Sequence, residues 1–402
     1  MTERAKVPTI RFNGFTDDWE QRKLSDILVQ RIEHQTISED APLLAFSYAE
    51  GVINPEDKKS NKRDFIMTDK YSKIFSRTEK DDIIYNPANV IHGAIHRNKH
   101  RTGVVSPIYK IFKCEKTSPK FVGERLHTDK FIEEIAKYIE GTVIKLRTLS
   151  PEQFLEMCIE VPSSYNEQEK IGLFFESLDN LTTLHQRKLL KLKNVKKAMI
   201  EKMFPKNGSN VPEIRFAGFT DAWEQSKLRD IADFNPKVEL PEVFEYVDLE
   251  SVVGIEMISH REETKITAPS RAQRLAQVGD LFYQTVRPYQ RNNFLFEKND
   301  NTYVFSTGYA QMRPNIDGYF LLSFVQTDLL VKAVLDRCTG TSYPAINAND
   351  LAEMEVRIPL RRHEQELIGA FFRNLDNLIT LHQRKLEKLQ NIKKACLEKL
   401  FV

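Results

Sequence analysis

The sequence is poor in cysteine and has no run of apolar residues long enough to span a membrane. The most apolar tract, residues 318–331, is interrupted by Asp328, well short of a span, and the first residues lack the apolar segment of a signal peptide. The four cysteines stand far apart without a C-x-x-C spacing, which argues against a disulfide framework and a zinc site: Cys114, Cys158, Cys338 and Cys396. We therefore expect a cytoplasmic protein with no membrane role and no metal site.

Common catalytic motifs are also absent. The chain contains no G-x-G-x-x-G, G-x-x-x-x-G-K-[ST], H-E-x-x-H or G-x-S-x-G, so nucleotide-binding, zinc-peptidase and hydrolase interpretations have no starting point. The net charge is only +2 in 402 residues, with 41% hydrophobic and 29% charged residues, a composition typical of folded domains. The distribution of charge, rather than its sum, must indicate the partners.

The chain is a duplication. Residues 7–27 and 211–231 agree at 16 of 21 positions, and residues 166–204 and 363–401 agree at 27 of 39 without a gap. Chance does not produce such a pattern, and the length allows two to four domains. The order along the chain is therefore a globule, a long segment, a linker, and then a second globule and long segment.

The second pair of repeats predicts two long helices. Both repeats lack proline, and their apolar residues recur at steps of three and four, as in Ile171, Phe174 and Leu178, the spacing of a coiled-coil seam. Neither helix has a mate within its own half, so we expect the two to pair with each other. A lone amphipathic helix on a globular surface and a coiled coil between separate copies of the chain are the alternatives.

The variable segments, about 28–165 and 232–362, share features that indicate one mixed α/β fold with diverged surfaces. Each ends in a capped short helix followed by a strand, with Ser150 or Asn347 as the N-cap. We predict an α+β protein with an internal pseudo-twofold repeat, in which two similar domains are separated by two long antiparallel coiled-coil helices. The predicted boundaries are 1–165 and 211–362 for the domains, 166–204 and 363–402 for the helices, and 205–210 for the linker.

Basic residues concentrate in both variable segments. Between residues 58 and 113 there are 13 Lys or Arg against five Asp or Glu, and the corresponding stretch of the second half interleaves arginine with tyrosine. Arginine suits bidentate contact with guanine, so these stretches indicate nucleic acid, although a solvated basic face is the alternative. The turn at 339–347 is either structural or a base-reading loop. The candidate DNA-contacting residues are Arg97, Lys99, Arg101, Arg287, Tyr289, Arg291, Thr341, Ser342 and Asn347.

On these features the chain resembles the specificity (S) subunit of a type I restriction-modification system. The resemblance rests on the repeated "P.IRF.GFTD.WEQ.KL.DI" and "EQ..IG.FF..LDNL.TLHQRK" and on "GDLFYQTVRPYQRN" and "TGTSYPAIN", and it covers essentially the whole chain. It implies two target recognition domains, each reading one half of a bipartite, asymmetric site in double-stranded DNA. The chain would be non-catalytic and carry no cofactor of its own.

The resemblance also implies partners. Two modification subunits would use S-adenosylmethionine to methylate adenine, and restriction subunits would use ATP and magnesium. The helices would dock the modification subunits or pair with each other through shared residues: Phe174, Leu178, Leu181, His185, Phe371, Leu375, Leu378 and His382. Two alternatives remain from the residues themselves, a self-sufficient bipartite DNA-binding regulator and an interaction scaffold that does not bind DNA.

Overall fold

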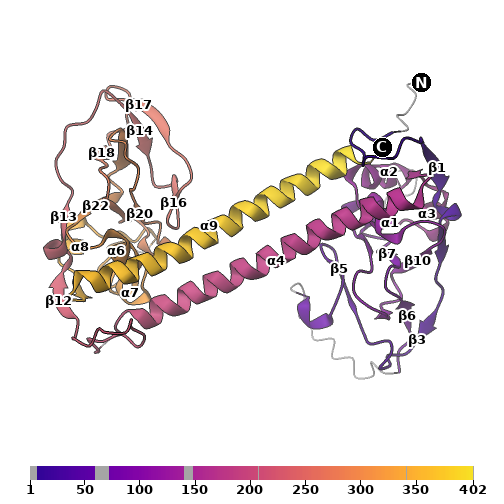
Figure 1. Cartoon of the computed structure of the whole chain (residues 1–402), viewed down its shortest axis with the longest axis horizontal. Coiled ribbons are helices and arrows are strands. Elements are labelled where there is room, and N and C mark those ends of the chain that lie inside the picture. The colour runs from indigo at the N-terminus through magenta and orange to yellow at the C-terminus, as the bar shows by residue number, and fades with distance from the viewer. Residues whose placement is uncertain (1–6, 59–71, 140–147, 207, 341, 402) are drawn as a thin grey trace. The chain divides into compact units, whose positions relative to one another are not determined.

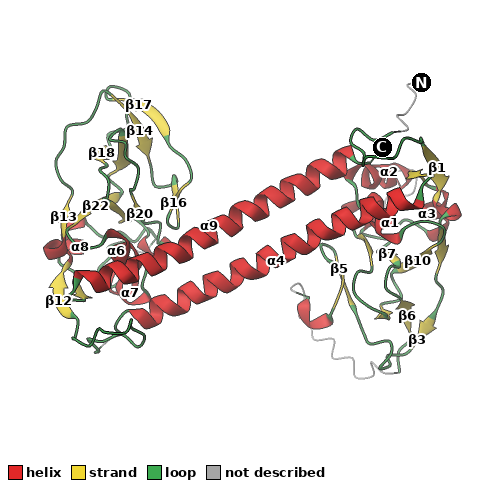
Figure 2. Ribbon diagram, in the orientation of Figure 1, coloured by secondary structure: helices red, strands yellow, loops and turns green. Residues whose placement is uncertain are grey.

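The chain folds into two compact units (Figure 1). The computed structural model describes residues 7–58, 72–139, 148–206, 208–340 and 342–401. Unit 1 contains residues 1–185 and 385–402, and unit 2 contains residues 186–384. The units do not coincide with the two sequence repeats, because each long helix contributes one part to each unit. The predicted long segments are single unbroken helices, α4 (Tyr165–Met203) and α9 (Arg362–Lys399) (Figure 2).

Unit 1 is built on small antiparallel sheets. The strand orders are β1-β11, β2-β10-β7-β8, β3-β6-β9 and β4-β5. Helices α1 and α2 follow β10, and the short α3 precedes β11. The elements are β1 (Trp19–Lys23), β2 (Leu28–Gln30), β3 (His34–Gln35), β4 (Ala45–Ser47), β5 (Gly51–Ile53), β6 (Phe75–Thr78), β7 (Ile83–Tyr85), β8 (Ile95–Arg97), β9 (Gly103–Val105), β10 (Lys110–Cys114), α1 (Pro119–Leu126), α2 (Asp129–Ile139), α3 (Pro151–Glu156) and β11 (Cys158–Pro162).

Unit 2 repeats part of this plan, although one of its sheets includes a parallel strand pair. Its sheets have the orders β12-β23, β13-β22-β19-β20, β17-β14-β21-β18 and β15-β16. The elements are β12 (Glu224–Lys227), α5 (Leu228–Ile231), β13 (Ala232–Phe234), β14 (Val243–Val247), β15 (Val252–Val253), β16 (Glu256–Met257), β17 (Arg261–Thr264), β18 (Ala272–Leu275), β19 (Leu281–Gln284), β20 (Phe294–Leu295), β21 (Tyr303–Ser306), β22 (Tyr309–Pro314), α6 (Gly318–Val325), α7 (Asp328–Leu335), α8 (Ala348–Ala352) and β23 (Glu355–Ile358).

The two units share a framework, which confirms the predicted pair of similar α/β domains. In each unit the opening strand pairs antiparallel with the strand that precedes a long helix, β1 with β11 and β12 with β23. The predicted N-caps are also present. Ser150 Oγ accepts a hydrogen bond from the Gln153 backbone at 3.2 Å, and Asn347 Oδ1 accepts one from the Asp350 backbone at 2.8 Å. These bonds satisfy backbone donors that the first turn of a helix leaves free.

The opening repeat clamps the start of each long helix. In unit 1 Arg11 Nε lies 2.7 Å from a carboxylate oxygen of Glu167, and the indole of Trp19 donates to the same carboxylate at 3.4 Å. In unit 2 Arg215 and Trp223 make the same contacts with Glu364, at 2.6 and 3.3 Å. Both glutamates are 1% exposed, and a buried carboxylate requires such partners. The repeated opening words thus have a structural cause.

The end of each long helix belongs to the unit of the opposite repeat. The backbone of Ile10 donates to the Lys399 carbonyl at 3.0 Å, and the backbone of Ile214 donates to the Lys202 carbonyl at 2.9 Å. These bonds use carbonyls that a helix C-terminus leaves unsatisfied. Each repeat therefore caps the helix that comes from the other repeat.

Within each unit the two long helices run antiparallel. In unit 1 Lys393 Nζ lies 2.6 Å from Asp179, and in unit 2 Lys196 Nζ lies 2.5 Å from Asp376. In unit 1 the ring of Phe401 stacks on that of Phe175 at 5.7 Å. The predicted helix pair is thereby confirmed within each unit, and the interpretation as a lone surface helix is wrong.

No single described helix is both long and apolar enough to cross a bilayer. Taken together, the bent helices α6 and α7 are long and apolar enough to span a membrane. Most of their apolar side chains, however, are buried in the core of unit 2. That core also contains the ends of the long helices, so the apolar tract seen in the sequence serves the packing of unit 2.

Candidate nucleic-acid interface

The loop after β19 is the most unusual backbone in unit 2. Strand β19 is fully buried, and the short turn Pro288–Gln290 that follows it is flanked by Arg287 (φ 55°) and Arg291 (φ 57°). A left-handed conformation at a residue other than glycine is uncommon and strained. The surrounding structure holds it, since Asn293 Oδ1 accepts the Gln284 backbone N–H at 2.9 Å.

The turn at 338–346 packs against this loop. The Arg287 backbone donates to the Pro344 carbonyl at 2.7 Å, and the Ile346 backbone donates to the Thr285 carbonyl at 3.0 Å. The structure thus brings together two sequence phrases that are more than 40 residues apart. Thr341 lies outside the described residues. Ser342 is exposed, whereas Asn347 caps α8 and its side chain also donates to Asp350.

An arginine and two tyrosines form the surface of this loop pair. The Arg287 guanidinium carbon lies 4.5 Å from the centre of the Tyr343 ring, a cation–π distance. Tyr343 is 63% exposed and Tyr289 is 50% exposed. We call Arg287, Tyr289, Ser342 and Tyr343 the tyrosine–arginine tip. Large exposed aromatics beside an arginine are the groups that nucleic-acid interfaces use for stacking and base contacts.

Arg291 has a different role. Its guanidinium pairs with Asp328 and donates to the Gln326 carbonyl at 2.9 Å. Gln326 is the C-cap of α6 and Asp328 is the first residue of α7, so Arg291 fastens the loop to the junction of these two helices. In this conformation Arg291 therefore anchors the loop, and its predicted contact with DNA stays a prediction. Arg287 and Arg291 are both half-buried, and they differ in their partners.

In unit 1 two of the predicted basic residues, Arg97 and Lys99, form ion pairs within the protein. Arg97 is 4% exposed and pairs with Asp81 and, at 3.0 Å, with Glu176 of α4. Lys99 Nζ lies 2.9 Å from Glu124 and 2.7 Å from Asp179. Burial alone would lower the pKa of Lys99, but the two carboxylates outweigh it and raise the pKa.

Arg97 is therefore closed to DNA, and its prediction as a base-contacting residue is wrong. Together with Lys99 it fastens the first globule to α4. Arg101 is exposed, and one of its guanidinium nitrogens lies 3.2 Å from the Asn54 side chain, so its role in DNA contact stays a prediction.

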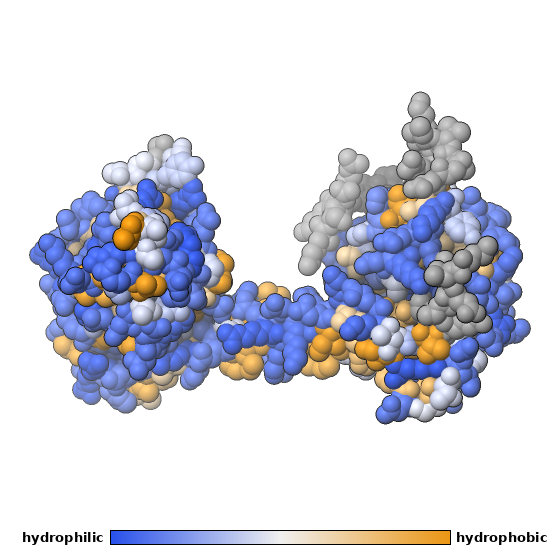
Figure 3. Space-filling view, turned by 90° about the horizontal axis from the view of Figure 1, so that it is seen from above, coloured by the Kyte–Doolittle hydropathy of each residue, from blue (hydrophilic) through white to orange (hydrophobic). Residues whose placement is uncertain are grey.

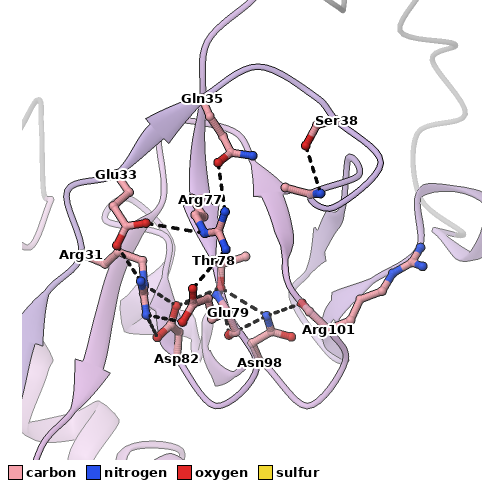
Figure 4. Close-up of polar contacts among 11 residues, drawn as sticks. Arg31, Glu33, Gln35, Ser38, Arg77, Thr78, Glu79, Asp82, Asn98 and Arg101 are labelled. Atoms are coloured by element: carbon pink, nitrogen blue, oxygen red, sulfur yellow. Dashed lines mark hydrogen bonds and ion pairs between the residues drawn. The ribbon is translucent and has the colours of Figure 1, made fainter.

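A neighbouring network absorbs further arginines of unit 1. Arg31 Nε donates to Asp82 at 2.9 Å, and Arg77 donates to Gln35 at 3.2 Å (Figure 4). Burial raises the pKa of Asp82, and the hydrogen bond from Arg31 opposes that rise. Figure 4 also shows the Arg101 side chain extending away from this network. The network joins neighbouring strands and pairs Arg31 and Arg77 with residues of their own unit.

The counterpart of the tyrosine–arginine tip in unit 1 is the loop after β7. The Leu149 backbone donates to the Pro87 carbonyl at 3.2 Å, which corresponds to the bond between Ile346 and Thr285 in unit 2. The loop at 86–93, rather than the stretch around Arg97, is therefore equivalent to the loop after β19. The matched phrases "DDIIY" and "GDLFY" in the sequence carried this alignment. The adjoining residues 140–147 lie outside the described residues.

The predicted helix residues divide into two groups. Leu178 and Leu375 are 7% and 9% exposed and belong to the cores of their units, while the rings of Phe174 and Phe371 pack on Phe12 and Phe216. Leu181 and Leu378 are exposed by 45% and 44%. The matched His185 and His382 are half-buried. Only Leu181 and Leu378 are well exposed for a partner.

A further exposed face of the long helices was missed in the sequence. Leu184 and Leu381 are 46% and 45% exposed, and the residues that continue their face at steps of three and four are exposed and identical in both helices: Arg187 and Lys191 in α4, Arg384 and Lys388 in α9. Along the stretch formed by the long helices, hydrophobic residues lie among hydrophilic ones (Figure 3). These positions are identical in the two repeats although no hydrophobic core requires them. That identity is the feature of the sequence that could have indicated this face.

Comparison with known proteins agrees with this architecture. Residues 220–391 match the family described as the type I restriction modification DNA specificity domain. The fold resembles the crystal structure of the type I restriction-modification system S subunit from M. genitalium, with a TM-score of 0.63 at 14% identity, over 98% of this chain and 99% of that one. Residues 220–391 thus carry a DNA specificity domain of this family, and the chain as a whole has the fold of the M. genitalium S subunit.

Among individual relatives, the HindI specificity subunit of Haemophilus influenzae (strain ATCC 51907 / DSM 11121 / KW20 / Rd) is 24% identical over 194 residues. The match covers 45% of this chain and 41% of that subunit, less than half of either. A crystal structure of the HsdS subunit from Thermoanaerobacter tengcongensis is similar at 15% identity, with a TM-score of 0.43 over 95% of this chain and 96% of that one.

Proposed function

We propose that the chain is the DNA sequence-recognition subunit of a type I restriction-modification complex. Each unit would read one half of a bipartite, asymmetric site in double-stranded DNA through the loops that follow β7 and β19. The observation that carries the proposal is that the two units share the order of one four-stranded sheet and the contacts that hold the start of each long helix, while their loop residues differ. A shared framework would place both loops in the same way against the DNA, and loops with different residues would recognise different base sequences.

In this proposal the chemistry lies in partner subunits. Two modification subunits would bind S-adenosylmethionine and methylate adenine, taking the base out of the duplex as enzymes that act on bases do. Restriction subunits would supply ATP-driven and magnesium-dependent steps. The chain itself would be non-catalytic and would select the site.

The exposed face of the long helices would dock the modification subunits. It carries leucines flanked by arginine and lysine at coiled-coil spacing, in the same order on α4 and α9. Two identical faces on one chain suit two copies of one partner. The support comes from Leu184 and Leu381, which no core of the described structure covers.

The test uses the purified complex of this chain with its modification subunits. Random genomic fragments are bound at moderate salt, recovered and sequenced, with the modification subunits alone as control. We expect the recovered fragments to share one word made of two short halves at a fixed separation, and the control to share none. Recovery without a common word would contradict the proposal and favour a scaffold. A word recovered equally by the chain alone would favour a self-sufficient regulator.

A further inference from the structure

The Arg287 side chain differs from the other loop arginine in its partners. Arg291 is held by Asp328 and by the Gln326 carbonyl. The Arg287 guanidinium lies over the Tyr343 ring at 4.5 Å, and no carboxylate of the described residues forms an ion pair with it. A ring covers one face of the planar guanidinium and leaves its edge of N–H groups open.

A strained backbone conformation, held by a hydrogen bond, sets the position of Arg287. Arg287 adopts φ 55° and ψ 54°, a conformation that costs energy for an arginine. It is held there because its backbone N–H donates to the Pro344 carbonyl at 2.7 Å, next to the residue that supplies the ring. Strain that the surrounding structure maintains is found at functional sites more often than elsewhere. The same contact that strains the backbone of Arg287 brings its side chain onto Tyr343.

We propose that Arg287, oriented by Tyr343, reads a guanine in the half-site recognised by unit 2. The inference rests on the proposed DNA-reading function and adds the base and the residue. The guanidinium edge would donate two hydrogen bonds to O6 and N7 of guanine in the major groove, the pair of acceptors that a planar fork matches. Tyr343 is a positioning residue, since its ring fixes the plane of the fork and makes no base contact of its own in this scheme.

The geometry favours a base over a phosphate. A phosphate contact needs a positive charge but not a fixed plane, and a lysine serves as well. An arginine stacked on an exposed ring loses rotational freedom, which helps only if the direction of its hydrogen bonds matters. Substitution of Arg287 by lysine therefore separates the two roles, because lysine retains the charge and loses the fork.

The test compares variants of the full chain, each co-expressed with the modification subunits, by long-read mapping of methylated adenine. In the wild type we expect a guanine at a fixed position of one half of the methylated word. Arg287→Lys should relax that single position by roughly ten- to a hundredfold in preference, the discrimination of one bidentate contact. Tyr343→Phe should retain the preference, because it keeps the ring, and Tyr343→Ala should relax the same position. Arg101→Lys in unit 1 is the matched control and should leave it unchanged.

Several results would overturn the inference. They are an unchanged word with Arg287→Lys, a uniform loss of methylation at all positions in that variant, and a wild-type word without guanine in either half. A relaxed position with Arg287→Lys that Tyr343→Ala does not share would remove the positioning role. If the wild-type complex methylates no bipartite word at all, the proposed function itself fails, and that result is separate because it appears before any substitution is made.

Discussion

Exchange of helix ends between the two repeats makes the stability of each unit depend on a residue from the other repeat. Phe204, just after α4, lies in the core of unit 2 and is 4% exposed. Its ring lies 5.5 Å from Phe320, 5.9 Å from Phe372 and 6.0 Å from Trp223. Phe401, just after α9, takes the corresponding place in unit 1. We predict that Phe204→Ala destabilises unit 2 and leaves unit 1 intact.

The size of the effect follows from the packing. Removing a buried phenylalanine ring costs about 3–5 kcal/mol, from lost burial and the cavity left behind. Phe204 is surrounded by rings that cannot easily close the gap, so we expect about 4 kcal/mol. For Phe401→Ala we expect about 3 kcal/mol in unit 1, because Phe401 is 8% exposed and lies near the end of the described chain.

Hydrogen exchange measured by mass spectrometry can assign the loss to a unit. With Phe204→Ala, the slowest amides of β19 and β22 should exchange roughly a hundredfold faster or more, while those of β7 and β10 keep their wild-type rates. Phe401→Ala should show the reverse pattern. Equal acceleration in both units, or a loss below about 1 kcal/mol for Phe204→Ala, a quarter of the expected value, would refute the assignment of these rings.

Three further predictions concern charge, pH and docking. Glu176→Arg should destabilise unit 1 by about 2 kcal/mol, less than for a fully buried pair because Glu176 is partly exposed, and Arg97→Glu added to it should restore part of the loss in thermal unfolding. Burial lowers the pKa of His96 to about 4, so on acidification the unfolded chain takes up this proton before the folded chain does. The free energy of unfolding of unit 1 should therefore fall by up to about 3 kcal/mol between pH 6.5 and 4. In urea titrations at several pH values, His96→Gln should reduce this pH dependence. Leu184→Asp with Leu381→Asp should weaken binding of the modification subunits at least tenfold in titration calorimetry, the loss of about 1.4 kcal/mol expected at an interface; unchanged affinity would show that this face is not used.

Much of the fold was predictable because its signals are local or duplicated. Helix periodicity, the absence of proline and the capping residues Ser150 and Asn347 lie in short stretches of sequence, and each acts on its own neighbours. The pairing of the long helices was predictable because neither repeat offers a mate for its apolar stripe. The exchange of helix ends was not, because Phe204 and Phe401 stand in nearly identical sequence, and nothing local states which globule each one completes.

The candidate site was predicted only in part, for a related reason. Arg97 and Lys99 stand in an acid-free stretch and look available, but carboxylates of α4 and α1, distant in sequence, pair with them. The spacing of basic residues along the chain shows which side chains lie on the same side of an extended stretch. It does not show which carboxylates pair with them in the folded protein. The DNA contacts predicted for Arg287 and Ser342 stay predictions. The Tyr343 ring beneath Arg287 required the fold, since a hydrogen bond between two distant loops brings it there.

The most direct test of the account is to map methylated adenine in a host without DNA methylation of its own. The host expresses the modification subunit from the same source, with or without this chain. We predict a methylated word of two short halves with a fixed gap, present only when the chain is present. Methylation of the same word without the chain, or no bipartite word although the complex is shown to form, would contradict the claim that the two units read the two halves of one site.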